Sequence, residues 1–322
     1  MKTSKIVVSV IAMAIIIVGI YFFTTGSSNP SNIRVGYLTS WAEGSFPIEA
    51  MREAGIAEKN GLNLSYEKFQ VGPPLVEAAL SNKLDVFLTG WVPAINLMTK
   101  SEDWVIVAKL TYFPIALMAR NGSGIQSVEE LKGKKIGVPY GSGAYPVVLS
   151  SLINHGLTPG KNVEIINIKP ADMGSALQAT QVDAVAWVEP SITVLQQKGL
   201  AYPIENYEDI GFIVFSKFYV KEHPEDVRKF LKAFKESQLY VAQNKKQAFK
   251  WFSDESQYDI SLIESLKITD NNFNAKTLSD VDMTINQSWI EATQKKIDWE
   301  FEQKIIDKDV NLASKIDLSY LG

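Results

Sequence analysis

A short unit of helix, turn and strand occurs twice in this chain, and the repetition limits the folds that the chain can adopt. Residues 79–86 read Ala-Leu-Ser-Asn-Lys-Leu-Asp-Val, and residues 176–184 read Ala-Leu-Gln-Ala-Thr-Gln-Val-Asp-Ala. In both copies a helix end leads through a turn to a strand that opens on aspartate. Each strand then runs into a tryptophan-proline element, at Trp91 to Pro93 and at Trp187 to Pro190. Two lobes that are built alike and face each other explain the repetition, and a chance likeness between two βα units is the alternative.

Strand-like and helix-like segments alternate over most of the chain. Short apolar or β-branched runs are followed by segments with apolar residues at helical spacing. This alternation predicts an α/β fold with mainly parallel sheets. The predicted strands are 33–37, 62–69, 84–88, 105–110, 136–138, 163–168, 182–188 and 212–215, and the predicted helices are 47–59, 73–80, 147–154, 175–179 and the segment from 224 onward.

The repeated unit and the return strand at 212–215 divide the chain into two predicted lobes. Residues 33–110 form the first part of lobe 1, residues 111–208 form lobe 2, and residues 209–322 complete lobe 1 and add C-terminal helices. Each lobe is expected to have its own sheet, with the ligand cleft between the lobes. The chain then crosses twice, near Thr111 to Pro114 and near Asp209 to Gly211, where small dihedral changes would close the cleft.

Residues 1–32 are predicted to be a signal or anchor segment followed by a polar spacer. Lys2 and Lys5 precede a run from Ile6 to Phe23 that contains no charged residue. Its length lies between the apolar core of a cleaved signal peptide and a full membrane span, so a transmembrane anchor and a cleaved signal both stay open. In both cases the lysines stay inside and the body of the protein is extracytoplasmic, in the periplasm or on the outer face of the cytoplasmic membrane.

Composition excludes several classes of function. The net charge is −4 and the chain has no long basic run, which argues against nucleic acid as a partner. The chain has no cysteine and two histidines, so disulfides, thiolate metal sites and multi-histidine metal centres are excluded. The sequence also has no activated-nucleophile motif, and we expect no catalytic residue, metal or cofactor.

Four further stretches lie in a characteristic order between Ile33 and Asn244. They are Gly72–Leu80 with Asp85, Ser127–Val138 followed by Gly141-Ser142, Ala176–Ala184 with Glu189-Pro190, and Glu222–Phe234. As an ordered set they resemble the extracytoplasmic solute-binding proteins of ABC importers, in the group for nitrate, aliphatic sulfonates, taurine and thiamine precursors. Two turn positions that commonly hold glycine in that group are here Asn82 and Thr180. Asparagine tolerates the left-handed conformation, but β-branched threonine does so poorly, so we expect the second turn to differ.

The resemblance implies a periplasmic-binding-protein-like fold that captures a small molecule between two α/β lobes and does no chemistry. The implied ligand is a small organic anion, a sulfonate or taurine-like molecule first, which lobe closure delivers to a permease and its ATPase. A pyrimidine precursor of thiamine is the alternative ligand. A ligand-sensing ectodomain of the same fold and an enzyme are the alternatives from other classes.

The loops that follow the predicted strands are the candidate ligand site, because ligands of α/β sheets bind beyond the carboxyl ends of the strands. After strand 136–138, a glycine-rich loop and a helix N-terminus would offer free amides to an anion through Ser142, Gly143 and Ala144, and the Ser142 hydroxyl would add a hydrogen bond. An ordinary strand-to-helix turn is the alternative reading of this loop.

Aromatic residues after the strands supply the predicted walls of the site. Their shared position beyond strand ends favours a ligand role, and ordinary core packing is the alternative for each. Glu189 would accept a hydrogen bond from a ligand amine, or else bridge the lobes or lie in solvent. The predicted residues besides the glycine-rich loop are Trp41, Thr89, Gly90, Trp91, Tyr145, Trp187 and Glu189.

Overall fold

The structure is a computed structural model that describes residues 32–321. The predicted signal or anchor run from Ile6 to Phe23 lies outside these described residues. Among the helices that the structure describes, none is both long enough and apolar enough to cross a membrane.

Eight strands form one hydrogen-bonded sheet in the order β2-β1-β3-β8-β4-β7-β5-β6. The outer strands pair in parallel, β1 with β3 and β5 with both β6 and β7, whereas β8 and β4 are antiparallel to their neighbours. The predicted α/β fold with parallel pairing at both ends is therefore present. The strands are β1 (Asn32–Leu38), β2 (Asn63–Phe69), β3 (Val86–Gly90), β4 (Trp104–Arg120), β5 (Lys135–Val138), β6 (Glu164–Asn167), β7 (Ala184–Trp187) and β8 (Ala201–Ser216).

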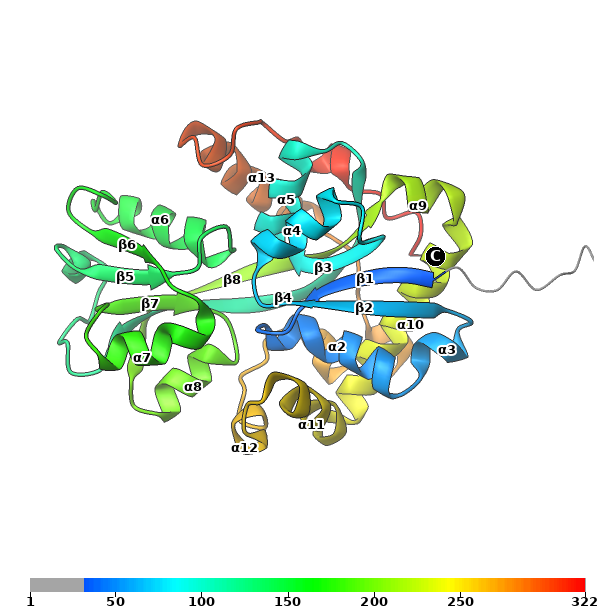
Figure 1. Cartoon of the computed structure of the whole chain (residues 1–322), viewed down its shortest axis with the longest axis horizontal. Coiled ribbons are helices and arrows are strands. Elements are labelled where there is room, and N and C mark those ends of the chain that lie inside the picture. Colours follow the sequence, from blue (N-terminus) through cyan, green and yellow to red (C-terminus); the bar gives the residue numbers. More distant parts are fainter. Residues whose placement is uncertain (1–31, 322) are drawn as a thin grey trace, which may run out of the picture. The chain divides into compact units, whose positions relative to one another are not determined.

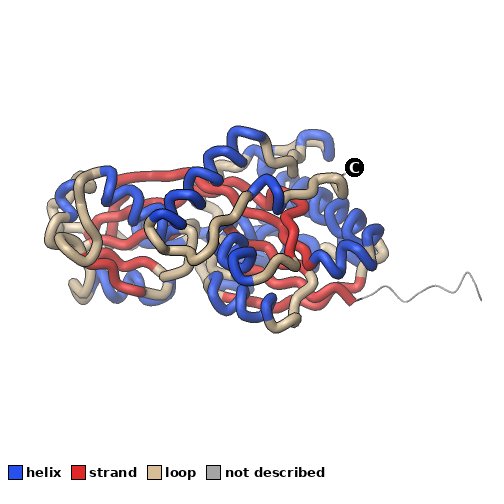
Figure 2. Tube along the Cα trace, turned by 90° about the horizontal axis from the view of Figure 1, so that it is seen from above, coloured by secondary structure: helices blue, strands red, loops and turns tan. Residues whose placement is uncertain are grey.

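Helices lie on both sides of the strands. Figure 1 shows α4, α5 and α6 on one side and α2, α7 and α8 on the other. Figure 2, turned by 90°, shows helices lying over the strands along the length of the chain. The helices are α2 (Ala42–Glu53), α3 (Ile56–Lys59), α4 (Gly72–Leu80), α5 (Trp91–Lys100), α6 (Ala144–Asn154), α7 (Met173–Gln178), α8 (Ser191–Gln197), α9 (Lys217–Glu222), α10 (Pro224–Gln243), α11 (Lys245–Ser256), α12 (Ile260–Ile263) and α13 (Gln287–Glu302). Short 3₁₀ turns are η1 (Glu129–Leu131), η2 (Pro170–Asp172), η3 (Asn271–Asn274), η4 (Leu278–Asp280) and η5 (Leu312–Lys315).

The two central strands join the two ends of the sheet. β4 has 17 residues and β8 has 16, and they pair along nearly their whole length. The expectation of a separate sheet in each lobe is therefore wrong, because both crossings are continuous strands. Thr111 pairs with Gly211 and Pro114 with Glu208, so the two predicted crossing segments lie side by side. The assignment of residues 33–110, 111–208 and 209–322 to two lobes stays a prediction.

The repeated unit has the same local structure in both copies. Asp85 accepts a 2.9 Å hydrogen bond from the amide of Arg34, and Asp183 accepts a 3.0 Å bond from the amide of Lys135, so each aspartate fastens the start of the adjacent parallel strand. The turns before them are also alike, with φ of 55° at Asn82 and 56° at Thr180. The expectation that the Thr180 turn differs is wrong, since the threonine adopts the left-handed conformation despite its β-branch.

Helix α2 begins earlier than the sequence indicates. We predict a helix from Pro47, the usual position of proline in a first turn, but α2 starts at Ala42 and contains Pro47 in its interior. Its start is fixed from outside the helix, because the amide of Ala42 donates a 3.0 Å hydrogen bond to the carbonyl oxygen of Glu189. The hydroxyl of Ser45 also donates to the carbonyl of Leu38 at the end of β1.

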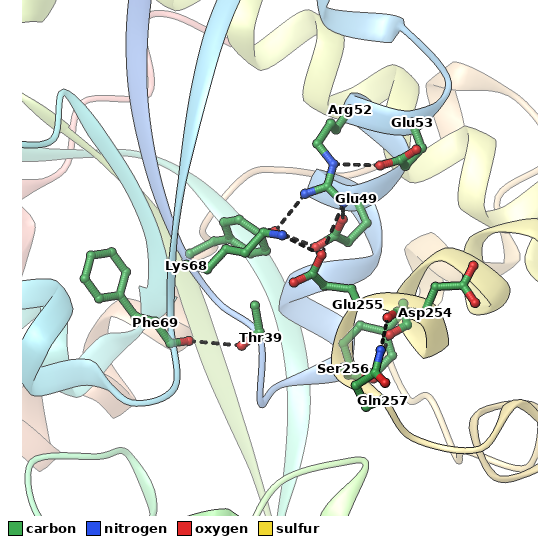
Figure 3. A network of polar contacts seen from close by, with 12 residues as sticks. Thr39, Glu49, Arg52, Glu53, Lys68, Phe69, Asp254, Glu255, Ser256 and Gln257 are labelled. Atoms are coloured by element: carbon green, nitrogen blue, oxygen red, sulfur yellow. Dashed lines mark hydrogen bonds and ion pairs between the residues drawn. The ribbon is translucent and has the colours of Figure 1, made fainter.

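The other end of α2 is held by a network of charges. Figure 3 shows the Arg52 guanidinium between the carboxylates of Glu49, Glu53 and Glu255, and Lys68 reaching the same Glu255. The network joins α2 to β2 and α11. With both ends fixed, α2 holds its first turn in a defined place at the centre of the sheet.

Candidate functional site

A small cavity lies where loops from both halves of the described chain meet. Its volume is about 30 Å³, far below the roughly 300–1,000 Å³ that is usual for a small-molecule pocket. The cavity is lined by Leu38, Trp41, Gly72, Gly90, Pro93, Phe113, Ser142, Gly143, Ala144, Trp187 and Val188. The structure thus brings together six of the ten residues that the sequence predicts, namely Trp41, Gly90, Ser142, Gly143, Ala144 and Trp187.

Four helices begin at this cavity. Trp41 precedes the first residue of α2, Gly72 is the first residue of α4, Gly90 precedes α5, and Ala144 opens α6. The first amides of a helix have no partner within the helix, and the helix dipole adds partial positive charge at this end. Several positive ends therefore converge on one small space.

The start of α6 offers the clearest set of free donors. Within residues 32–321, the amides of Ser142, Gly143 and Ala144 donate no hydrogen bond. The Ser142 hydroxyl, in contrast, donates a 2.6 Å bond to the carbonyl of Pro139. This hydroxyl is therefore not available as the additional donor that we expect from the sequence. The groups of this loop that are free to bind an anion are its backbone amides.

Three side-chain polar groups near the cavity also lack partners in the described chain. They are the indole N–H groups of Trp41 and Trp187 and the hydroxyl of Thr89, all of which are buried. Buried polar groups are nearly always paired, so unpaired donors grouped around a cavity mark a place for acceptors from a ligand. The two tryptophans are thus placed as hydrogen-bond donors as well as apolar walls.

The ring of Trp41 sits in a slot made by two glycines. A Cβ atom on Gly44 would lie 2.4 Å from Cε3 of the Trp41 ring, and a Cβ on Gly211 would lie 2.5 Å from Cη2. The ring of Phe113 packs edge-on against Trp41, with the ring centroids 4.5 Å apart. Phe113 and Gly211 belong to the predicted crossings, so the cavity wall touches both central strands.

Trp91 and Tyr145 lie next to the cavity residues but do not line the cavity. The indole N–H of Trp91 donates a 2.8 Å hydrogen bond to Asp209, whose other oxygen accepts a 2.9 Å bond from Lys296. Trp91 faces a separate groove of about 430 Å³ beside α6 and α13. Tyr145 is half-buried and packs on Tyr140, with the ring centroids 4.7 Å apart.

Glu189 is buried, and its carboxylate is already occupied. It accepts hydrogen bonds from the amide and the hydroxyl of Thr193, at 3.0 and 2.9 Å, at the start of α8. Burial raises the pKa of Glu189, whereas these hydrogen bonds lower it. In this conformation the side chain caps α8, and its backbone carbonyl joins it to Ala42 of α2.

Five of the cavity residues are not among the ten predicted site residues, although Val188 lies in a loop after a predicted strand and Phe113 in a predicted crossing. The five are Leu38, Gly72, Pro93, Phe113 and Val188. Gly72 has a signal in the sequence, because it opens the first of the four stretches that carry the family resemblance. The structure supplies the physical reason for glycine, since a Cβ there would lie 2.4 Å from Cγ of Pro93. Glu43, whose carboxyl is fully buried and unpaired, follows Trp41 in the loop after the first predicted strand but is not among the predicted site residues either. The described residues contain no group of three or more metal-ligating side chains.

Comparison with solved structures identifies the fold. The chain superposes on the periplasmic aliphatic sulphonate binding protein SsuA of Escherichia coli with a TM-score of 0.74 and 21% sequence identity, covering 89% of this chain and 92% of SsuA. SsuA of Xanthomonas axonopodis pv. citri, solved with bound MOPS, gives a TM-score of 0.74 and 20% identity over 90% and 99% of the two chains. The fold is therefore that of the periplasmic binding proteins.

Sequence comparisons lead to the same group of proteins. A Bacillus subtilis protein that has been assigned to aliphatic sulfonate binding is 26% identical over 300 residues, which cover 90% of this chain and 86% of that protein. The taurine-binding periplasmic protein of Escherichia coli is 27% identical over 66% of this chain and 67% of its own length. The family model described as "NMT1/THI5 like" matches residues 58–248, more than half of the chain, and the chain therefore belongs to the NMT1/THI5-like family.

Proposed function

We propose that this protein is the extracytoplasmic substrate-binding component of an ABC importer and that it captures a small organic anion with a sulfonate head. The observation that carries the proposal is the set of unpaired donors around the cavity, the amides of Ser142, Gly143 and Ala144 with the indole N–H of Trp187. Donors held in place before the ligand arrives bind an anion without a further cost of ordering. The sulfonate- and taurine-binding relatives support the same ligand class.

The donors suit a sulfonate better than a cation or a neutral sugar. A sulfonate brings three acceptor oxygens and one negative charge, which match several N–H groups at the positive ends of helices. Trp41 and Trp187 would shield the carbon next to the sulfur, and Thr89 and Gly90 would complete the wall. Trp91, Tyr145 and Glu189 belong to the proposed site only if the cleft rearranges around a larger ligand.

Binding requires movement, because a cavity of about 30 Å³ does not hold an organosulfonate. The segments Thr111–Pro114 and Asp209–Gly211 are the proposed hinge, and their pairing lets both move as one. Opening must separate Ala42 from Glu189, whose backbone hydrogen bond joins α2 to the start of α8. Small-angle scattering should show compaction when ligand is added. An unchanged scattering profile with ligand bound would contradict closure of the cleft.

The proposed location is outside the cytoplasm, as in the periplasmic relatives. The body would be tethered by residues 6–23 or released after cleavage of that segment, and its partners would be a permease and an ATPase. N-terminal sequencing of the mature protein distinguishes the tether from the cleaved signal. Recovery of the protein from the cytoplasm would contradict the proposed location.

A thermal-shift screen tests the proposed ligand class directly. Ligand at one hundred times its dissociation constant stabilises a protein by about 2.7 kcal/mol, which such a screen detects. The panel should hold alkanesulfonates, taurine, nitrate, bicarbonate and an aminopyrimidine. Stabilisation by sulfonates supports the proposal, whereas stabilisation by the aminopyrimidine alone would replace it with thiamine-precursor binding.

A further inference from the structure

Glu43 is a buried carboxyl group without a hydrogen bond of ordinary geometry in the described chain. It is the second residue of α2, its exposed fraction is 0%, and neither of its oxygens has a hydrogen-bond partner among residues 32–321. Burial raises the pKa of Glu43 well above its ordinary range. An unpaired buried carboxyl costs a protein several kcal/mol when it is charged, so burial favours the neutral form of Glu43.

The surroundings of Glu43 connect it to the cavity. The Glu43 amide and the Trp41 indole N–H are near enough to lower the pKa of Glu43, although neither makes a hydrogen bond of ordinary geometry to the carboxyl. The Trp41 ring also lines the cavity. Across the junction with the other half, Glu189 raises the pKa of Glu43 by charge repulsion. The residues before Glu189, Trp187 and Val188, line the same cavity.

The other acidic groups that face Glu43 already have partners. Glu189 accepts hydrogen bonds from Thr193, and Lys267 beside it lowers its pKa. Asp270, the other charged group that raises the pKa of Glu43, accepts a 2.7 Å bond from the amide of Tyr112 and lies 3.8 Å from the ammonium of Lys109. Among these three buried acids, Glu43 is the one whose two carboxyl oxygens both lack a hydrogen-bond partner in the described chain.

The unpaired groups are therefore of two opposite kinds. The amides at the start of α6 and the Trp187 N–H need acceptors, and the Glu43 carboxyl needs a donor with positive charge. We propose that Glu43 is the specificity residue that recognises an ammonium group, so that the site prefers a zwitterionic aminosulfonate to a plain alkanesulfonate. This inference rests on the proposed function, since it presumes a sulfonate bound at the α6 amides.

Recognition would release a proton. The neutral Glu43 carboxyl and a ligand ammonium combine into a carboxylate–ammonium pair, and the carboxyl proton goes to solvent. The ligand thereby supplies the opposite charge that the fold does not, and a charged hydrogen bond forms in a site from which water is excluded. A ligand without the ammonium leaves Glu43 protonated and unpaired, and a site built for a polar group rejects the analogue that lacks it.

Calorimetry on the full chain tests this with taurine, which carries the ammonium, and ethanesulfonate, which lacks it. In the wild type we expect taurine to bind at least tenfold more tightly, and Glu43→Gln to reduce that ratio to within about threefold. Glu300→Gln is the matched control, because Glu300 on α13 is also buried with two unpaired oxygens, but its charged neighbours are Asp209 and Lys296 rather than the cavity-lining Trp41. This control should leave the ratio unchanged.

A second readout does not depend on the stability of any variant. Titrating wild-type protein with taurine in buffers of different ionisation enthalpy should show release of close to one proton, and ethanesulfonate should release none. Equal affinities for the two ligands in the wild type, or no proton release with taurine, would overturn the role of Glu43 while leaving sulfonate binding intact. If neither sulfonate binds, the proposed function fails together with this inference.

Discussion

The ring of Trp41 rests directly on the backbone of Gly211. A Cβ atom at position 211 would lie 2.5 Å from Cη2 of the indole, well inside van der Waals contact. Trp41 lines the cavity, and Gly211 lies in β8 at the proposed hinge, opposite Thr111 of β4. A ligand that moves Trp41 must therefore act on the strand about which the halves are proposed to rotate.

Gly211→Ala should destabilise the protein and weaken ligand binding, because the added methyl group enters the space of the Trp41 ring. Overpacking of this kind costs about 1–3 kcal/mol in the free energy of unfolding, and chemical denaturation measures it. Gly174→Ala is the control, since a Cβ there would meet Leu200 at 3.5 Å, an ordinary contact, within helix α7. Equal stability of Gly211→Ala and wild type would show that the slot is not tight.

Gly143→Pro should weaken sulfonate binding by about 10- to 150-fold, since a hydrogen bond to a charged group is worth about 1.5–3 kcal/mol. Gly143 has φ of −58°, which proline adopts, so the substitution removes the amide donor without changing this dihedral angle. Gly143→Ala keeps the donor, and its Cβ would lie 3.7 Å from Asp209. Titration calorimetry compares the two variants, and equal affinities would exclude the Gly143 amide as a ligand contact.

Thr180→Gly should raise the free energy of unfolding by about 1 kcal/mol, because it relieves a β-branched residue from a left-handed conformation. The equivalent turn provides the control. Asn82 has nearly the same φ but tolerates it better, so Asn82→Gly should change stability by a few tenths of a kcal/mol at most. A gain at Asn82 as large as that at Thr180 would mean that strain at the threonine is not the cause.

Stability should fall as the pH rises from about 5 to 8. Burial and the nearby Asp209 raise the pKa of Glu300 to about 8. In this window the folded chain holds a proton on Glu300 that the unfolded chain has lost, so the free energy of unfolding decreases by up to about 1.4 kcal/mol per pH unit. Glu43 has a raised pKa and adds to the same trend.

Glu300→Gln should remove most of the Glu300 contribution, and denaturation midpoints measured at pH 5, 6.5 and 8 will show whether it does. The substitution removes a titrating group without breaking a hydrogen bond, because neither Glu300 side-chain oxygen has a partner in the described chain. If the denaturation midpoint of Glu300→Gln falls with pH as steeply as that of the wild type, a group other than Glu300 causes the pH dependence of stability.

The repeated unit was predictable because its determinants are local. A helix end, a left-handed turn at Asn82 or Thr180 and an aspartate that accepts a backbone amide all lie within a few residues of one another. The same holds for α6, whose glycine-rich start after β5 is visible in the sequence. The six predicted residues that line the cavity come from such strand-to-helix junctions.

The continuous central strands could not be predicted in this way. Residues 111–120 and 201–211 contain Pro114, Pro203 and several acids that interrupt a strand pattern, and only their long-range pairing makes them one ladder. The start of α2 likewise depends on Ala42 meeting Glu189, far along the chain. Tertiary contacts of this kind override local signals such as the proline at position 47.

The roles of individual acids were also beyond the sequence. The position of Glu189 after a predicted strand indicated a ligand role, yet its carboxylate accepts hydrogen bonds from the amide and hydroxyl of Thr193. Glu43 lies in the loop that the sequence predicts between strand 33–37 and a helix from Pro47, and only packing shows that its carboxyl is buried and unpaired. Burial and pairing depend on what the rest of the fold brings near a residue.

The most direct test of the account is calorimetric titration of the full chain with short alkanesulfonates and aminosulfonates, followed by chemical identification of the ligand recovered afterwards. The account predicts saturable binding of one ligand per chain, with the ligand recovered unchanged. The absence of saturable binding for every sulfonate, or conversion of the ligand into a product, would contradict it.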